Sequence, residues 1–306
     1  MKIAIIGQAA FGKDVLSALV DKNENVVAVL CPPDNPGRPE DPIKSAAIEN
    51  QIPVFQYKRM RDKEAIAEFL SLNIDLCVMA FVTDIVPDEI LEAPRFGTIQ
   101  YHPSLLPEHR GPSSINWPII QGKSKTGLTV FWPDKGLDTG PILLQKEFEI
   151  TKTDTLGSVY FGKLYPAGVE AMVEAVEMVK NGTAPKIEQD HSKATYEGWC
   201  RSSDVMIDWN NPGVEIYNLI RGSDPSPGAN TLWNQKSIYL FSTSFESSNH
   251  DNPPGTVTKI SDESFSLSVS GGIITIGRVK VDREAKIMAA DFVKSHKLKI
   301  GDRFGL

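Results

Sequence analysis

The chain has 306 residues, 41% hydrophobic and 23% charged, with a formal net charge of −7. These values are typical of an ordinary soluble globular protein. No apolar run reaches the roughly 18 to 20 residues that a membrane span needs, and the start lacks a signal-peptide pattern. Three widely separated cysteines indicate neither a disulfide framework nor a metal knuckle, so we expect a cytoplasmic protein without a membrane partner.

Short β-branched segments alternate with amphipathic segments through the first half of the chain. We predict strands at residues 3–6, 26–30, 75–79, 97–101 and 128–132, and helices at residues 12–19, 43–50 and 62–72. The strands read as buried on both faces, which is typical of a parallel sheet. The alternation predicts an α/β fold with a doubly wound, mostly parallel, Rossmann-like sheet and ligands at the carboxyl ends of its strands.

The sequence then predicts a long helix, and after it the pattern changes to short strands. Residues 154–181 predict one helix, with Asp154 as its cap and Gly182 as its end. After about residue 204, a helix at 213–221 precedes short strands at 255–257, 265–268, 272–276 and 278–281. These strands predict a smaller OB-like β-barrel. Because single cores seldom grow beyond this length, we expect two domains, residues 1–203 and 204–306.

The segment from Gly7 to Asp14 resembles a phosphate-binding loop but departs from it. It follows a strand, opens a helix and matches the Walker A spacing as far as Lys13. The next position requires a hydroxyl for Mg²⁺ but holds Asp14, whose carboxylate would repel phosphate. Ala9 stands where a dinucleotide fingerprint requires its second glycine. A structural strand-to-helix turn is therefore the better interpretation.

Polar residues follow the strand at residues 97–101. Because alternate residues of a strand share a face, Gln100 and His102 point to the same side where the strand ends. Such a pair of donors can stabilise an oxyanion, an effect worth about 3 to 4 kcal/mol for one good donor. Asp138, in a glycine-bounded turn, could orient His102 or take a proton. A structural role explains either residue alone, but the set favours an active site.

Other chemistries have weaker support from the residues. His102 and His109 lack helical spacing and a third ligand, so we expect no metal site. No Gly-x-Ser-x-Gly elbow offers a serine nucleophile. Cys77 lies inside an apolar strand, where a core role is favoured over a reactive thiol.

The chain resembles the folate-dependent formyltransferases. The resemblance rests on His102-Pro103-Ser104-Leu105-Leu106-Pro107 with Arg110-Gly111, and on Gly136-Leu137-Asp138-Thr139-Gly140. It continues at Ala194-Thr195-Tyr196, Ile207-Asp208-Trp209, Ile220-Arg221-Gly222 and Pro227-Gly228-Ala229, and so spans nearly the whole chain. The family includes methionyl-tRNA formyltransferase and the amino-terminal hydrolase domain of 10-formyltetrahydrofolate dehydrogenase. The runs Ser114-Ile115-Asn116-Trp117 and Phe131-Trp132 are more similar to the latter.

The resemblance implies a co-substrate and roles for the site residues. It implies that 10-formyltetrahydrofolate donates the formyl group, without a metal or nicotinamide. His102 would stabilise the oxyanion and act as an acid, and Asp138 would orient His102 or accept the proton of the nucleophile. The pterin would lie against seven residues, Asp84, Ile85, Val86, Ser104, Leu105, Leu106 and Pro107.

Gln100 departs from the family pattern. Transferases of the family carry Asn at this position, and the hydrolase domain of the dehydrogenase carries an apolar residue. The longer glutamine side chain retains an amide, but a displacement of about 1 Å can cost about 10²-fold in rate. Gln100 is therefore a candidate catalytic residue, and the sequence leaves open whether its amide is correctly positioned to donate to the oxyanion.

The formyl acceptor also stays open. Residues 31–41, where methionyl-tRNA formyltransferase has a basic loop for tRNA, hold one basic and three acidic residues, a poor composition for binding phosphates. The chain ends without an aldehyde dehydrogenase domain, so we expect no full dehydrogenase activity. Three functions remain: formyl transfer to a small amine or hydrolysis by water, formylation of initiator Met-tRNA, and, less favoured, non-catalytic folate binding.

Overall fold

The computed structural model describes residues 1–305, and the chain divides into two compact units. The first unit comprises Met1–Arg110, Gly127–Glu147 and Lys163–Tyr196. The second comprises Gly111–Thr126, Phe148–Gly162 and the chain from Glu197 onward. The expected division into residues 1–203 and 204–306 stays a prediction. Within residues 1–305, we find no helix with the length and apolar character that crossing a membrane requires.

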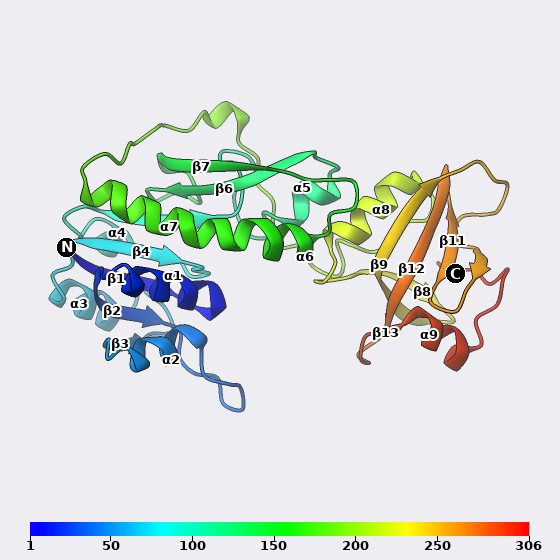
Figure 1. The fold of residues 1–306 in the computed structure, drawn as a ribbon, viewed down its shortest axis with the longest axis horizontal. Helices are drawn as coiled ribbons and strands as arrows, with labels where there is room; N and C mark the ends of the chain where they lie inside the picture. The colour runs from blue at the N-terminus through cyan, green and yellow to red at the C-terminus, as the bar shows by residue number, and fades with distance from the viewer. Residues whose placement is uncertain (306) are drawn as a thin grey trace. The chain divides into compact units, whose positions relative to one another are not determined.

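A seven-stranded sheet runs through the first unit in the order β3-β2-β1-β4-β5-β6-β7 (Figure 1). Its strands are β1 (Lys2–Gly7), β2 (Asn25–Cys31), β3 (Val54–Gln56), β4 (Leu76–Ala80), β5 (Thr98–His102), β6 (Lys125–Phe131) and β7 (Ile142–Glu149). Strands β1 to β5 pair in parallel, so their carboxyl ends share one edge. β6 runs antiparallel to β5. The expected α/β fold with a mostly parallel sheet is confirmed.

Helices cover both faces of this sheet. They are α1 (Ala9–Asp21), α2 (Pro42–Glu49), α3 (Lys63–Ser71), α4 (Asp88–Leu91) and α7 (Tyr165–Lys180), with a short 3₁₀ turn η2 (His191–Lys193) after them. On one face, Ile6 of β1 belongs to a core cluster with Phe69 of α3 and Ile90 of α4. On the other face, Tyr101 of β5 stacks on Phe11 of α1, and α1 packs against α7 (Figure 1).

The prediction of one continuous helix at residues 154–181 is wrong, because the segment is helical but interrupted. The segment forms α6 (Leu156–Val159), a π-helical turn η1 (Tyr160–Leu164) and then α7. Pro166 lies in the first turn of α7 and lacks the backbone N–H that would continue a regular helix, which accounts for the interruption. The cap is Thr155, which forms a capping box with Ser158, and not Asp154.

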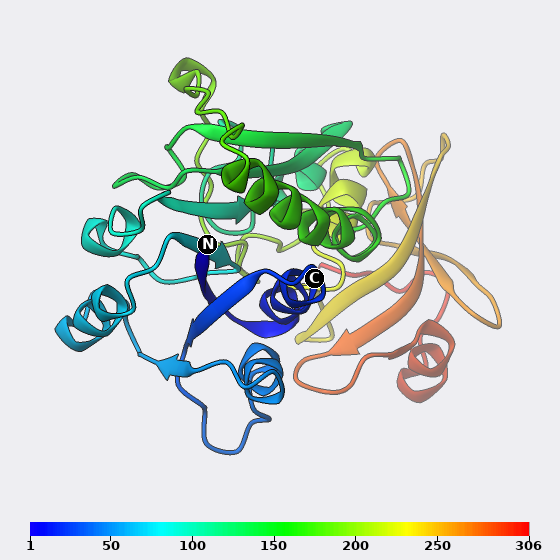
Figure 2. The ribbon, with the colours of Figure 1, turned by 60° about the vertical axis from the view of Figure 1, so that its left-hand side comes forward.

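The second unit contains a six-stranded sheet in the order β10-β11-β12-β9-β8, with β13 paired to β12. Its two long strands, β9 in yellow and β12 in orange, lie side by side in Figure 2. Its strands are β8 (Ala229–Trp233), β9 (Lys236–Ser247), β10 (Val257–Ile260), β11 (Phe265–Val269), β12 (Gly272–Val281) and β13 (Ile287–Met288); its helices are α5 (Asn116–Ile120), α6, α8 (Gly213–Gly222) and α9 (Ala289–His296). The pairs are antiparallel. An antiparallel β domain is confirmed, and closure into an OB-like barrel stays a prediction.

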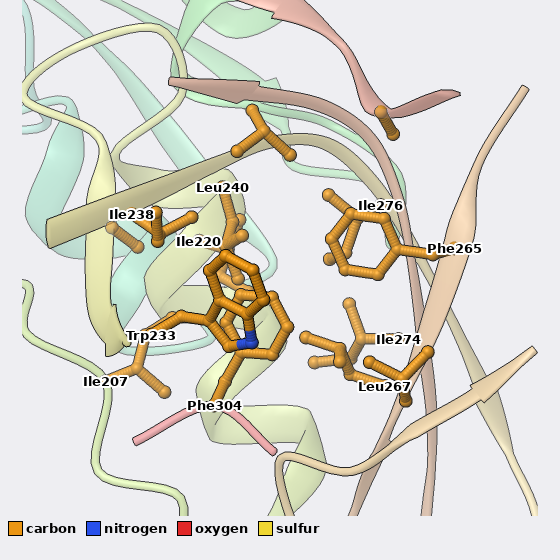
Figure 3. Close-up of a cluster of buried hydrophobic side chains, with 14 of the residues drawn as sticks. Ile207, Ile220, Trp233, Ile238, Leu240, Phe265, Leu267, Ile274, Ile276 and Phe304 are labelled. Carbon is orange, nitrogen blue, oxygen red and sulfur yellow. The ribbon is translucent and has the colours of Figure 1, made fainter. Parts of the chain in front are cut away.

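A hydrophobic core fills this second unit. Figure 3 shows Trp233, Phe265 and Phe304 among aliphatic side chains of β9, β11 and β12, with Ile220 of α8 against them. The two short strands predicted at residues 272–276 and 278–281 are one strand, β12. Gly277 allows the strand to continue, because a Cβ there would lie 2.9 Å from the Ser242 carbonyl oxygen of β9.

Candidate functional site

The amino terminus of α1 is occupied by a carboxylate of the chain itself. The backbone N–H of Ala9 donates to both carboxylate oxygens of Asp41, at 2.8 and 3.1 Å. Asp41 also accepts from the N–H of Ile43 at 3.0 Å, where it caps α2. A helix amino terminus is a favourable place for an anion. Asp41 therefore stands where a phosphate would sit in a nucleotide-binding loop, which supports the structural interpretation of this turn.

His102 and Asp138 lie together at the carboxyl end of β5. Nδ1 of His102 is 3.6 Å from a carboxylate oxygen of Asp138, and the two residues are 6% and 8% exposed. Nε2 of His102 lies 2.8 Å from the carbonyl oxygen of His109. Because a carbonyl only accepts, Nε2 carries a hydrogen and donates it, which directs Nδ1 toward Asp138.

Gln100 shares the face of β5 on which His102 lies. It is half-buried and pairs in register with Met79 of β4 and Phe131 of β6. Among residues 1–305, the side-chain amide of Gln100 makes no hydrogen bond. The structure thus brings two of the three candidate catalytic residues into a pair and leaves the third beside them.

The segment after His102 is held by two polar side chains of the neighbouring strands. The hydroxyl of Thr129, on β6, donates to the Ser104 carbonyl at 2.7 Å and accepts from the Leu106 N–H at 3.2 Å. The amide of Gln145, on β7, donates to the Leu106 carbonyl and to the Thr129 hydroxyl, at 2.8 and 2.9 Å. Ser104 and Leu106 are buried. Leu105 and Pro107 of this segment are partly exposed.

The other three residues expected to contact the pterin follow β4. The carboxylate of Asp84 accepts from the backbone N–H of Met60 at 2.6 Å. Ile85 is 73% exposed, whereas Val86 is buried. Since β4 and β5 are parallel neighbours, this segment and the one after His102 leave the same edge of the sheet.

The turn that carries Asp138 requires its two glycines. A Cβ on Gly136 would collide with the Thr139 side chain, and a Cβ on Gly140 would collide with the Trp132 carbonyl. Asp138 itself has a φ of +55°, a conformation that Asp adopts more readily than most residues. Asp134 accepts from the Gly136 N–H and from the Thr139 hydroxyl. The turn is therefore a closely packed structure with the Asp138 backbone in a fixed conformation.

Sequence reasoning missed a buried glutamine that joins this turn. The amide of Gln189 donates to the carbonyl oxygens of Asp138 and Gly140, at 3.0 and 2.7 Å. It also accepts hydrogen bonds from the guanidinium of Arg110, a residue to which the sequence motif assigns no role. Gln189 lies in an aperiodic polar segment, so no local pattern identifies it. Thr129 and Gln145 were missed as well, because single polar residues on strands carry no distinctive signal.

All three cysteine thiols have raised pKa values. Burial raises the pKa of the Cys77 thiol to about 12 and that of Cys31 to about 12. Burial, with a smaller effect of Asp204, raises the pKa of Cys200 to about 11. Residues 1–305 contain no group of three or more His, Cys, Asp or Glu side chains that could hold a metal ion.

Comparison of the whole chain with known proteins gives consistent matches. Residues 1–176 match the formyl transferase family, and residues 200–297 match the family's C-terminal domain. Human cytosolic 10-formyltetrahydrofolate dehydrogenase is 42% identical over 253 residues, which are 81% of this chain and 28% of that protein. Methionyl-tRNA formyltransferase from Clostridioides difficile (strain 630) is 33% identical over 306 residues, which are 98% of this chain and 99% of that enzyme.

Solved structures agree on the fold. The crystal structure of HypX from Aquifex aeolicus in complex with tetrahydrofolic acid superposes with a TM-score of 0.72 at 18% identity. The match covers 99% of this chain and 48% of HypX. At this identity the likeness shows the fold alone.

Proposed function

Because this chain belongs to the formyl transferase family, we propose that it moves or hydrolyses the formyl group of 10-formyltetrahydrofolate. The observation that carries the proposal is the buried pair of His102 and Asp138 at the carboxyl end of β5, with 3.6 Å between Nδ1 and the carboxylate. An imidazole beside a carboxylate can move a proton and support charge that develops on a reacting carbonyl. The chain spans 28% of the human dehydrogenase, so that protein's complete reaction is not carried over.

The proposed reaction begins with attack of an amine or water on the formyl carbon. The proton of the nucleophile moves to Nδ1 of His102, because Nε2 is engaged with the His109 carbonyl. The carboxylate of Asp138 stabilises the imidazolium that results. The imidazolium supports the oxyanion and then gives its proton to N10 as the bond between N10 and the formyl carbon breaks. The products are tetrahydrofolate and either the formylated amine or formate.

The pterin of the donor would bind at the shared edge of β4 and β5. The proposed contacts are the ones expected from the sequence, and they come from two segments: Asp84, Ile85 and Val86, and Ser104, Leu105, Leu106 and Pro107. Support comes from the parallel pairing that brings both segments to one edge. Gln100, on the same face of β5 as His102, would donate from its amide to the formyl oxygen.

The acceptor distinguishes the candidate functions. Full-length similarity to a methionyl-tRNA formyltransferase favours initiator Met-tRNA as the formyl acceptor. The loop before α2 favours a small amine or water, because its acidic residues Asp34 and Glu40 also neutralise Lys44 in the first turn of α2, at 2.5 and 2.9 Å. We propose the small acceptor first and Met-tRNA as the alternative. Non-catalytic folate binding is the third candidate, and the expected cytoplasmic location stays a prediction.

One assay tests these candidates. The protein is incubated with 10-formyltetrahydrofolate, and release of tetrahydrofolate is followed without an acceptor, with amino sugars and with methionylated initiator tRNA. Release without an acceptor identifies a hydrolase, and release that requires tRNA identifies the alternative. A folded protein that binds the folate and releases nothing in any mixture would be a folate-binding protein, and the catalytic proposal would be wrong.

A further inference from the structure

We propose that Gln189, held by Arg110, is a positioning residue that keeps the Asp138 carboxylate at His102. This inference rests on the proposed function, because it assumes that the pair of His102 and Asp138 is catalytic. It concerns how the separation of that pair is maintained, and it assigns Gln189 no contact with the reacting atoms.

Gln189 uses all of its hydrogen-bonding groups inside the first unit. Its amide nitrogen donates to the carbonyl oxygens of Asp138 and Gly140, at 3.0 and 2.7 Å. Its oxygen accepts from Nη2 and Nε of Arg110, at 2.6 and 3.3 Å. The residue is 5% exposed. A buried amide that is satisfied in this way has one favourable orientation.

Arg110 sets that orientation. A guanidinium only donates, so it faces the amide oxygen and turns the amide nitrogen toward the two carbonyls. Arg110 is 2% exposed, and its other hydrogen bonds go to the Tyr196 hydroxyl and to Nδ1 of His191. No carboxylate forms a salt bridge with it among residues 1–305. A buried cation without a counter-charge is costly unless its N–H groups are hydrogen-bonded, so Arg110 depends on the acceptors that Gln189, Tyr196 and His191 provide.

The same short stretch of chain also fixes His102. The carbonyl that accepts from Nε2 of His102 belongs to His109, the residue before Arg110. The N–H groups of His109 and Arg110 donate to the hydroxyl and the carbonyl of Thr195, at 2.8 and 3.0 Å. The backbone at Arg110 thus holds the imidazole, and its side chain holds the Asp138 turn through Gln189.

Two substitutions of Gln189 test the proposal. Gln189→Glu keeps the contact with Arg110 but replaces the two donors with oxygen, which repels the carbonyls of the turn. Gln189→Met removes all four hydrogen bonds at similar length. We expect kcat for tetrahydrofolate release to fall about 10- to 100-fold in both, as a displacement near 1 Å would cause. KM for the folate should change less than threefold, because the residue does not contact it.

A buried arginine elsewhere provides the matched control. Arg221 is 5% exposed and donates to Asn218, Thr151 and Asp154 in the second unit. Arg221→Lys should lower the melting temperature. At temperatures where this variant is folded, its kcat should stay within twofold of the wild-type value. A purely structural role for Gln189 would give the same result. Should Gln189→Met fail to fold, Gln189→Glu decides, since its carboxylate retains the charge-assisted contact.

Outcomes separate this inference from the proposed function. If the wild type releases tetrahydrofolate and Asp138→Asn does not, while either folded Gln189 variant keeps kcat within twofold, the inference is wrong and the function stands. A rise in KM with unchanged kcat would also overturn it. If Asp138→Asn is fully active, the proposed mechanism fails and this inference fails with it.

Discussion

Nδ1 of His102 faces a carboxylate oxygen of Asp138 across 3.6 Å, and both residues are less than one-tenth exposed. The imidazole is held on its other side by the His109 carbonyl at 2.8 Å. The two groups come from different parts of the sheet, since His102 ends β5 and Asp138 lies in the turn between β6 and β7. Their proximity is therefore a product of the fold and not of the local chain.

Asp138→Asn should reduce tetrahydrofolate release about 10²- to 10⁴-fold, because the His102 imidazolium loses the carboxylate that stabilises it and general acid–base catalysis by His102 is impaired. Asparagine retains the size of the side chain and tolerates a positive φ, so the melting temperature should stay within a few degrees. Release is followed by absorbance, and Glu263→Gln, at an exposed carboxylate, serves as the control. Turnover retained within threefold would remove Asp138 from the catalytic set.

Gln100→Asn should preserve or raise formyl transfer. The shorter amide matches the residue of the family's transferases, and the Gln100 side chain makes no hydrogen bond among residues 1–305 that the change would break. Steady-state kinetics of the variant are compared with those of His102→Ala, which should lose activity deeply. A loss in Gln100→Asn as deep as in His102→Ala would mean that the site is built around the longer side chain.

Gly140→Ala should lower the free energy of unfolding by about 1 to 3 kcal/mol, because the added Cβ collides with the Trp132 carbonyl and forces the backbone to shift. Denaturant titration measures the change. Gly162→Ala is the control, since a Cβ at Gly162 would meet no neighbouring heavy atom of residues 1–305 within 4 Å. Equal stability of the two variants would show that the turn accommodates a side chain at Gly140.

Thr129→Val should cost about 1 to 3 kcal/mol, because it leaves buried backbone groups of Ser104 and Leu106 without their hydroxyl partner. It should also raise KM for the folate, since these groups hold the proposed pterin-binding segment. Thr126→Val, on the same strand, is the matched control, because the buried hydroxyl of Thr126 makes no hydrogen bond within residues 1–305. That control should be neutral or stabilising, and a similar loss in both variants would contradict the role given to Thr129.

The parts of the fold that the sequence predicted are those with continuous apolar runs. β1, β2 and β4 are buried along nearly their whole length. Their runs of apolar residues were sufficient to predict them as strands. β3 has three residues, too few for a period, and β7 alternates buried and partly exposed side chains with polar residues among them. Neither was predicted, although β7 supplies Gln145.

The candidate site was predicted to the extent that its residues lie in compact motifs. His102 and Asp138 each have glycine or proline nearby, and the family resemblance, now confirmed, joined them. Gln189 could not be found in this way. It meets Asp138 only because the chain returns to the sheet after α7, and such a contact between distant segments leaves no trace in local spacing.

The carboxylate of Asp41 at the start of α1 has a consequence for ligand selection. Parallel sheets of this topology favour phosphate at the first strand-to-helix turn, and cells contain millimolar nucleotides that compete for such turns. Here a phosphate would have to expel a carboxylate that already holds two backbone N–H groups. The carboxylate of Asp41 thus takes the place of an external anion at that turn, and a nucleotide would find no free N–H donor at Ala9.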